Sequence, residues 1–398
     1  MTEIEVIRVD LPREGLPDLI DSQRGINRAA EKLAAGNGPV ALDAERASGF
    51  RYSQRAYLVQ LRRAGSGTFL IDPTEFENLN IIQEATTDTD WILHAASQDL
   101  VCLAEVGLKP NNALFDTELA GRILGLPKVG LGTLAEQLLY ISLAKEHSAA
   151  DWSTRPLPDE WLAYAALDVE FLFELWEILS KQLQEANKYE WALQEFEHVR
   201  LTTEPIVRQD PWRKLSGIHK LKDQQQLAVA RELWFARNEI AKNTDIAAGR
   251  ILNDSQLIEI ATCSNWQAAL VLPFMKLRGI IRNLDVWANA FDTGINVPAS
   301  DLPPLKVKSD TVPHPRNWQA RHPEAFARLE AIRTAIGTLA EELQIPTENL
   351  ITPEVVRKAV WLKPSDLSEL EKILDDNRVR QWQREHVRGL IAQTLNLN

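Results

Sequence analysis

The chain has 398 residues, of which 45% are hydrophobic and 25% are charged, and only two of them are cysteines. This length exceeds one ordinary domain, and the composition is that of a soluble globular protein rather than a disordered, disulfide-rich or membrane-spanning one. Because the acidic N-terminus lacks the pattern of a signal peptide, we expect a cytoplasmic location and no membrane partner.

The net charge of −12 is not that of a typical nucleic-acid-binding protein, which usually carries a basic footprint. The charge is unevenly distributed, however. Residues 1–209 hold 19 Lys and Arg against 33 Asp and Glu, whereas residues 210–398 hold 25 against 23. An excess of carboxylates in the first half is compatible with bound cations, which would reverse the local sign of the charge.

A sheet is predicted in the first half of the chain. Short β-rich runs at 40–43, 57–61 and 68–72, separated by polar or glycine-containing turns, predict a meander. Further strands and helices alternate after them, which indicates an α/β sheet flanked by helices. These are strands at 91–94 and 114–116 and helices at 98–106, 117–124 and 131–139. One long helix is expected to begin after Pro158 and Asp159 and to run through Leu175.

The second half is predicted to be purely helical. Two segments share an apolar pattern at a constant offset of 99 positions, which indicates one packing plan used twice, although two amphipathic patterns can also coincide by chance. The matching pairs are Leu233/Ile332, Ile240/Leu339, Ala241/Ala340, Ile246/Ile345, Ile251/Leu350, Leu252/Ile351 and Leu257/Val356. Prolines between the copies predict an extended linker. We expect domains at 1–209, 210–296 and 316–398, with a linker at 297–315.

Acidic residues and one tyrosine form a candidate site, although each has an ordinary alternative. Asp43 and Glu45 lie two apart at the end of the first predicted strand, so both face one side of the sheet, but acids at strand ends are usually solvated. Tyr164 and Asp168 lie one turn apart on one face of the predicted long helix, where a packed aromatic and a solvated acid are common. Asp99 opens a helix, where it could simply cap the N-terminus.

Taken together and in order, these residues resemble three motifs of the DEDD exonuclease superfamily. The motifs are Asp43-Ala-Glu45 after an apolar strand, Leu93-His-Ala-Ala-Ser-Gln-Asp99-Leu, and Tyr164-Ala-Ala-Leu-Asp168-Val. The tyrosine and its four-residue step resemble the DEDDy branch and, within it, the ribonuclease D family. Agreement at 70–73, 115–117 and 151–157 extends the resemblance over about residues 20–185. It implies an α/β exonuclease domain with a ribonuclease H-like mixed sheet flanked by helices.

The resemblance also implies a role for each site residue. Asp43 would bridge two divalent ions, Mg²⁺ or Mn²⁺, Glu45 and Asp168 would complete one ion site, and Asp99 would hold the other ion through water. Carboxylates are hard oxygen ligands suited to these ions, and two ions about 4 Å apart can stabilise both oxygens of an in-line displacement at phosphorus. Tyr164 is expected to orient the water, because a pKa near 10 makes it a poor base at neutral pH.

Further side chains are candidates for contact with the substrate, and each has a structural or solvated alternative. They are His94, Gln98, Lys145 and Arg155. The chain departs from many relatives in the first motif, where Ala44 and Arg46 replace the usual Thr and Phe. This departure leaves open how the last bases of the substrate are held.

The start of the helical half resembles the helicase-and-ribonuclease-D C-terminal (HRDC) domain. The resemblance covers residues from Asp210 to about Gly294, through Trp234, Arg237, Asn238 and the segment 251–257. It implies an accessory domain that binds nucleic acid, and the repeat implies a second, diverged copy from about Asn317 to Leu397. The family carries two such domains. A basic strip on the helices is weakly indicated, by Lys220, Lys222, Arg278 and Arg282.

The favoured interpretation is a 3′–5′ exoribonuclease that releases nucleoside 5′-monophosphates from RNA with a free 3′ end, most naturally tRNA precursors. One alternative keeps the fold and acts on DNA, because the residues do not show what reads the 2′-hydroxyl. Another is a non-catalytic RNA-binding protein on the same scaffold, which the presence of all four acids and the tyrosine disfavours. We expect a monomer, although the oligomeric state is left open by the sequence.

Overall fold

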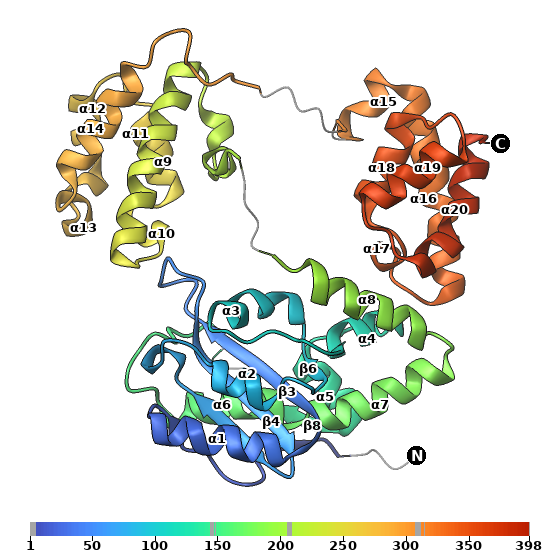
Figure 1. The fold of residues 1–398 in the computed structure, drawn as a ribbon. Helices are drawn as coiled ribbons and strands as arrows, with labels where there is room; N and C mark the ends of the chain where they lie inside the picture. Colours follow the sequence, from blue (N-terminus) through green and yellow to red (C-terminus); the bar gives the residue numbers. More distant parts are fainter. Residues whose placement is uncertain are drawn as a thin grey trace.

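The structure is a computed structural model that describes residues 5–143, 147, 149–204, 209–306, 312–313 and 315–397. An α/β domain forms from the first half of the chain, and two separate groups of helices form from the second half (Figure 1). The predicted fold class, a mixed sheet flanked by helices and followed by helical domains, is confirmed. Within the described residues no helix is both long and apolar enough to cross a lipid bilayer.

The central sheet has six strands in the order β2-β5-β4-β3-β6-β7. Strands β3, β4 and β5 pair antiparallel as the predicted meander, whereas β2, β6 and β7 join in parallel. A separate parallel pair is formed by β1 and β8. The short strands β1, β2 and β8 were not predicted. The bounds are β1 Ile7–Val9, β2 Leu19–Ile20, β3 Asn37–Arg46, β4 Ala56–Ala64, β5 Gly67–Ile71, β6 Trp91–Leu93, β7 Leu114–Asp116 and β8 Ile141–Leu143.

Helices cover both faces of this sheet, and the side chains of β3 alternate between the two faces. Val40, Leu42 and Ala44 pack into a core shared with helices α1, α2 and α3, while Asp43 and Glu45 face the side covered by α6. The bounds are α1 Gln23–Ala35, α2 Asn80–Ala85, α3 Leu100–Glu105, α4 Thr117–Ile123, α5 Leu131–Leu139, α6 Asp159–Glu170, α7 Leu172–Glu185 and α8 Tyr189–Thr202. The acidic positions therefore lie between the sheet and α6.

The single long helix predicted from Pro158 is wrong, because the chain forms two helices, α6 and α7, that meet at Phe171. Neither glycine nor proline marks the break, so local sequence could not reveal it. Phe171 is only 1% exposed and packs with Leu143 and Leu167, and the Arg13 guanidinium lies 4.6 Å from the centre of its ring. The break therefore coincides with a buried aromatic side chain in tertiary contact.

The helical half confirms the repeat. Helices α9, α10 and α11 have counterparts α16, α17 and α18, and the first residues within each pair differ by 99 positions. The first group comprises α9 Gln224–Thr244, α10 Ala248–Ile251, α11 Asp254–Ala261, α12 Trp266–Leu270, α13 Arg278–Ile281 and α14 Leu284–Ile295. The second comprises α15 Trp318–Arg321, α16 Pro323–Leu343, α17 Thr347–Leu350, α18 Pro353–Leu362, α19 Leu367–Asp376 and α20 Gln381–Leu395. The domain boundaries near 209, 296 and 315 stay a prediction.

The two helical groups contact the α/β domain in different ways. Helices α15–α20 share one hydrophobic core with α4, α7 and α8. Polar contacts reinforce this junction: the buried Lys188 ammonium donates to the carbonyls of Ile123 and Gln344, and Arg380 pairs with Glu195 at the edge of the core. Helices α9–α14 instead enclose a core of their own, and no hydrophobic cluster of the described residues joins them to the α/β domain.

Candidate active site

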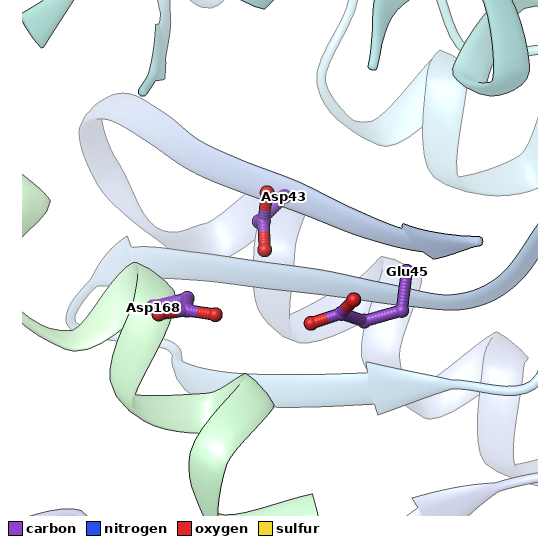
Figure 2. A group of neighbouring side chains, drawn as sticks. All are labelled: Asp43, Glu45 and Asp168. Atoms are coloured by element: carbon purple, nitrogen blue, oxygen red, sulfur yellow. The ribbon is translucent and has the colours of Figure 1, made fainter. Parts of the chain in front are cut away.

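Three of the predicted carboxylates come together between β3 and α6. Asp43 and Glu45 project from β3, and Asp168 projects from α6 toward them (Figure 2). One carboxylate oxygen of each lies within 4.8 Å of the other two. The strand pleat explains the first pair, and the packing of α6 across β3 and β4 brings in the third. Sequence spacing alone could not establish this contact, which joins residues more than 120 positions apart.

Asp99 lies beside this trio rather than within it. It begins α3, but its side chain caps no backbone N–H, so the capping alternative is not what the structure shows. The buried Asp99 carboxyl instead lines the same cavity as Asp43, whose negative charge repels it, and one of its oxygens lies 3.9 Å from an Arg46 guanidinium nitrogen. Arg46 reaches this position from the end of β3, where the pairing with β4 shifts register after Glu45.

Tyr164 lies one helical turn before Asp168, as the spacing predicts, and the two side chains face the same cavity. The ring is half-buried and packs against Trp152 and edge-on against His147. Burial, followed by the negative charge of Asp168, raises the pKa of Tyr164 far above its usual value. The phenol therefore keeps its proton at physiological pH and can orient a neighbouring oxygen.

Burial is also the main reason why the carboxyl pKa values rise. The pKa of Asp43 is raised, and those of Glu45, Asp99 and Asp168 are raised well above their usual values. Mutual repulsion adds to the effect, and Arg46 offsets part of it at Asp43, Glu45 and Asp99. A buried cluster of this kind is stable in its ionised form only when cations compensate the charge. Its all-oxygen ligand set suits a hard divalent cation.

The stabilisation of the fold by Mn²⁺ is expected to increase from about pH 6 to about pH 8. Protons and cations compete for the same oxygens, and the raised pKa values move this competition to a higher pH than that of ordinary carboxyls. Without metal, acids whose folded pKa is raised favour the folded state at low pH, and this contribution is lost as the pH rises through that pKa. Melting temperatures with and without Mn²⁺ at both pH values test this. Equal shifts at the two pH values would contradict it.

Asp116, at the end of β7, supports the segment that carries Asp99. Its carboxylate accepts hydrogen bonds from the backbone N–H groups of Ala95 and Ala96, at 3.1 and 2.8 Å, and from those of Glu118 and Leu119 at the start of α4. Ala95 has the left-handed φ of +55°, so the turn before Asp99 needs this support. Burial raises the pKa of Asp116 to about 6. The motif at 115–117 does not by itself indicate this role.

Replacing Asp116 by Ala is expected to lower the free energy of unfolding by about 2–4 kcal/mol, because buried N–H groups lose their acceptor. Chemical denaturation measures this loss. Asp116→Asn keeps one acceptor oxygen and is expected to lose less. An alanine variant as stable as the wild type would show that the turn at Ala95 holds without this carboxylate.

The predicted substrate-contact residues are placed differently. His94 and Gln98 both line the cavity. His94 shares a 2.9 Å hydrogen bond with Thr117, and burial lowers its pKa to about 4, so the ring is neutral. Lys145 lies outside the described residues. Arg155 donates to Asp72 and to three backbone carbonyls, which gives it a structural role and leaves no geometric support for a phosphate contact.

The carboxylates line a cavity of about 400 Å³ that the sequence did not outline completely. The loop between β3 and β4, residues 47–55 and hereafter the β3–β4 loop, contributes Ser48, Gly49 and Phe50 to its wall. No motif marks these residues, so they could not be found from the sequence. Among the described residues that line the cavity, Arg46 is the only Lys or Arg. The cavity is therefore acidic, with one fixed cation beside Asp99.

Models of known families match three parts of the chain. A model described as 3′-5′ exonuclease matches residues 17–184, one for the HRDC domain matches 226–264, and one described as 3′ to 5′ exonuclease C-terminal domain matches 311–395. A ribonuclease D from Jannaschia sp. (strain CCS1) is 29% identical over 304 residues, which are 70% of this chain and 74% of that protein.

Solved structures share the whole architecture. A protein from Bifidobacterium adolescentis is 34% identical with a TM-score of 0.89, and the match covers 98% of this chain and all of that one. Escherichia coli RNase D matches with a TM-score of 0.70 at 21% identity, over 95% of this chain and 98% of that one, which shows a shared fold.

Proposed function

Because the chain belongs to the ribonuclease D family of 3′–5′ exonucleases, we propose that it removes nucleotides one at a time from the 3′ end of RNA and releases nucleoside 5′-monophosphates. The observation that carries this proposal is the convergence of Asp43, Glu45 and Asp168 within 4.8 Å, with Tyr164 and Asp99 beside them. In the sequence, all five residues match the DEDDy motifs that this chain resembles.

The residues present fit a pair of divalent cations, Mg²⁺ or Mn²⁺. Every candidate ligand is a carboxylate, and the raised pKa values record how unfavourable the uncompensated negative charge is. Asp43, Glu45 and Asp168 would hold one ion, and Asp43 with Asp99 would hold the other. When bound, such ions neutralise charge on the phosphate and lower the pKa of the attacking water.

The chain's own residues would then orient the reactants. Water attacks the terminal phosphorus, the bond from phosphorus to the 3′-oxygen of the preceding nucleotide breaks, and that oxygen takes up a proton. Tyr164 keeps its proton and positions the water through its hydroxyl, beside Asp168. Arg46 is the cavity's fixed cation and suits a phosphate oxygen of the incoming strand.

A structured RNA with a short 3′ tail, such as a tRNA precursor, is the proposed substrate. Support comes from the E. coli relative, which is described as an exoribonuclease involved in structured RNA processing. We propose that the helical domains act as accessory RNA-binding parts, consistent with the HRDC match at 226–264. The cytoplasm, where such precursors are processed, is the proposed location.

The proposal is tested by incubating the protein with a 3′-tailed RNA hairpin and Mg²⁺ and resolving the products. Stepwise shortening with release of 5′-mononucleotides is expected from the wild type and not from Asp168→Asn. The same hairpin with a deoxyribose tail separates RNA from DNA preference. Faster loss of the DNA tail would favour the alternative substrate, and binding without any cleavage would favour a non-catalytic protein.

A further inference from the structure

The β3–β4 loop is the part of the active site that the catalytic motifs do not explain. It leaves β3 directly after Glu45 and Arg46, and its first half forms part of the cavity wall through Ser48, Gly49 and Phe50. Within the loop, the backbone N–H groups of Phe50 and Arg51 donate to the carbonyl of Ala47. These two hydrogen bonds alone give the loop little support against displacement by an incoming nucleotide.

The loop is held from outside by the first helical group. In Figure 1 it rises from the sheet to the end of α10. The Arg250 guanidinium donates to the carbonyl of Gly49 at 2.7 Å and lies 4.0 Å from the centre of the Phe50 ring. The backbone N–H of Ala247 donates to the carbonyl of Phe50 at 3.0 Å. Two of the three wall residues are therefore bound directly by α10 and the residue before it.

Asp245 holds the second half of the loop. It ends α9 in a left-handed conformation, with a φ of +48°, and one carboxylate oxygen accepts from the backbone N–H of Ser53 at 2.8 Å. The other oxygen accepts from the hydroxyl of Tyr57 at 3.0 Å. Burial favours the protonated acid, but the hydrogen bonds from Ser53 and Tyr57 outweigh it, so the pKa of Asp245 is lowered and the group is ionised. Asn238, also on α9, accepts from the hydroxyl of Tyr52 at 3.0 Å.

The opposite side of the loop is tied to the catalytic domain. Arg51 donates to the hydroxyl of Ser153 at 2.7 Å, in the segment that leads into α6 and its catalytic side chains. Because α9–α14 share no hydrophobic cluster with the α/β domain in the described residues, these polar contacts to the loop are the prominent attachment of that helical group. The loop is thus held by hydrogen bonds from the first helical group on one side and from the catalytic domain on the other.

We propose that Asp245 and Arg250 are positioning residues of the active site, which hold the β3–β4 loop so that its wall receives the 3′-terminal nucleotide. This inference rests on the proposed function. The first helical domain then has a second task besides RNA binding, because it completes the nucleotide pocket. Neither residue touches the reacting atoms, so both act through Gly49, Phe50 and Ser53.

The test measures steady-state kinetics of Asp245→Ala and Arg250→Ala on a five-nucleotide RNA and on a long tailed RNA. We expect KM to rise between about 10- and 100-fold on both substrates, with a smaller change in kcat, because a displaced wall misplaces the terminal nucleotide whatever the RNA length. Lys242→Ala removes an exposed cation from the same helix and is the matched control. Asp245→Asn keeps hydrogen-bonding groups toward Ser53 and Tyr57 and is expected to restore most of the affinity.

Three outcomes would overturn the proposal. The first is a KM within about twofold of wild type on both substrates. The second is a rise in KM on the long RNA alone, which would indicate that these residues bind the RNA body instead. The third is an equal rise in KM for Asp245→Asn and Asp245→Ala. Amide hydrogen exchange of residues 47–55 supplies a readout that needs no catalysis, and faster exchange is expected in Asp245→Ala. If the wild type cleaves no RNA, the proposed function fails, while this exchange difference still decides whether α9 and α10 hold the loop.

Discussion

Replacing Asp43 by Asn is expected to lower mononucleotide release about 1,000-fold or more. The carboxylate belongs to the trio with Glu45 and Asp168, and it also interacts electrostatically with Asp99. Loss of a shared cation ligand removes several kcal/mol of transition-state stabilisation, and each 1.36 kcal/mol is a factor of ten in rate. Single-turnover cleavage of a 3′-labelled RNA measures the effect.

The same variant is expected to be at least as stable as the wild type when no metal is present. The substitution Asp43→Asn would remove one charge from a cluster whose members already repel one another, so the melting temperature should not fall. Asp88→Asn, at an exposed position away from the cavity, is the matched control and should keep full activity. An Asp43→Asn protein that retains more than about a tenth of the wild-type rate would exclude Asp43 from the reaction.

Tyr164→Phe is expected to lower kcat about 100-fold while KM and the Mn²⁺-induced rise in melting temperature stay near the wild-type values. The phenyl ring keeps the packing against Trp152, and only the hydroxyl beside Asp168 is lost. The pH dependence separates positioning from base catalysis. Because the pKa of Tyr164 is raised, its ionisation should not appear in the rate profile, and wild type and variant should have profiles of the same shape.

A profile in which the wild-type rate rises through the tyrosine pKa, and the variant's does not, would assign proton abstraction to Tyr164 instead. If Mn²⁺ no longer raised the melting temperature of Tyr164→Phe, the substitution would have disturbed the carboxylates that bind the metal. Trp161→Phe is a suitable control, since Trp161 packs on the same aromatic group one turn away without approaching the carboxylates.

The core of the site could be predicted because its motifs are local. A two-residue step on a strand and a four-residue step on a helix determine which side chains share a face, and Asp43, Glu45, Tyr164 and Asp168 follow these rules. Asp99 could be named from its motif. Its approach to Arg46 could not, because Arg46 follows a register shift at the end of β3 that the sequence does not mark.

What the sequence could not show depends on contacts between distant parts. The break between α6 and α7 lies at Phe171, a buried residue in tertiary contact and not a helix-breaking one. Arg155 has a structural role because it donates a hydrogen bond to Asp72, which lies 83 positions away. The hold of Asp245 and Arg250 on the β3–β4 loop spans about 200 positions. Side chains of these types are common on protein surfaces, so composition and periodicity carry no signal for such pairings.

The shared core of α15–α20 with α4, α7 and α8 has a consequence during synthesis. About 190 residues separate the end of α8 from the end of α20, and a ribosome that adds about 5–20 residues per second needs about 10–40 s to make them. Throughout that interval the newly folded catalytic half would present an uncovered apolar surface on these three helices. We therefore expect chaperones to bind the nascent chain, and aggregation when translation stops near residue 300, because early-made and last-made helices share one interior.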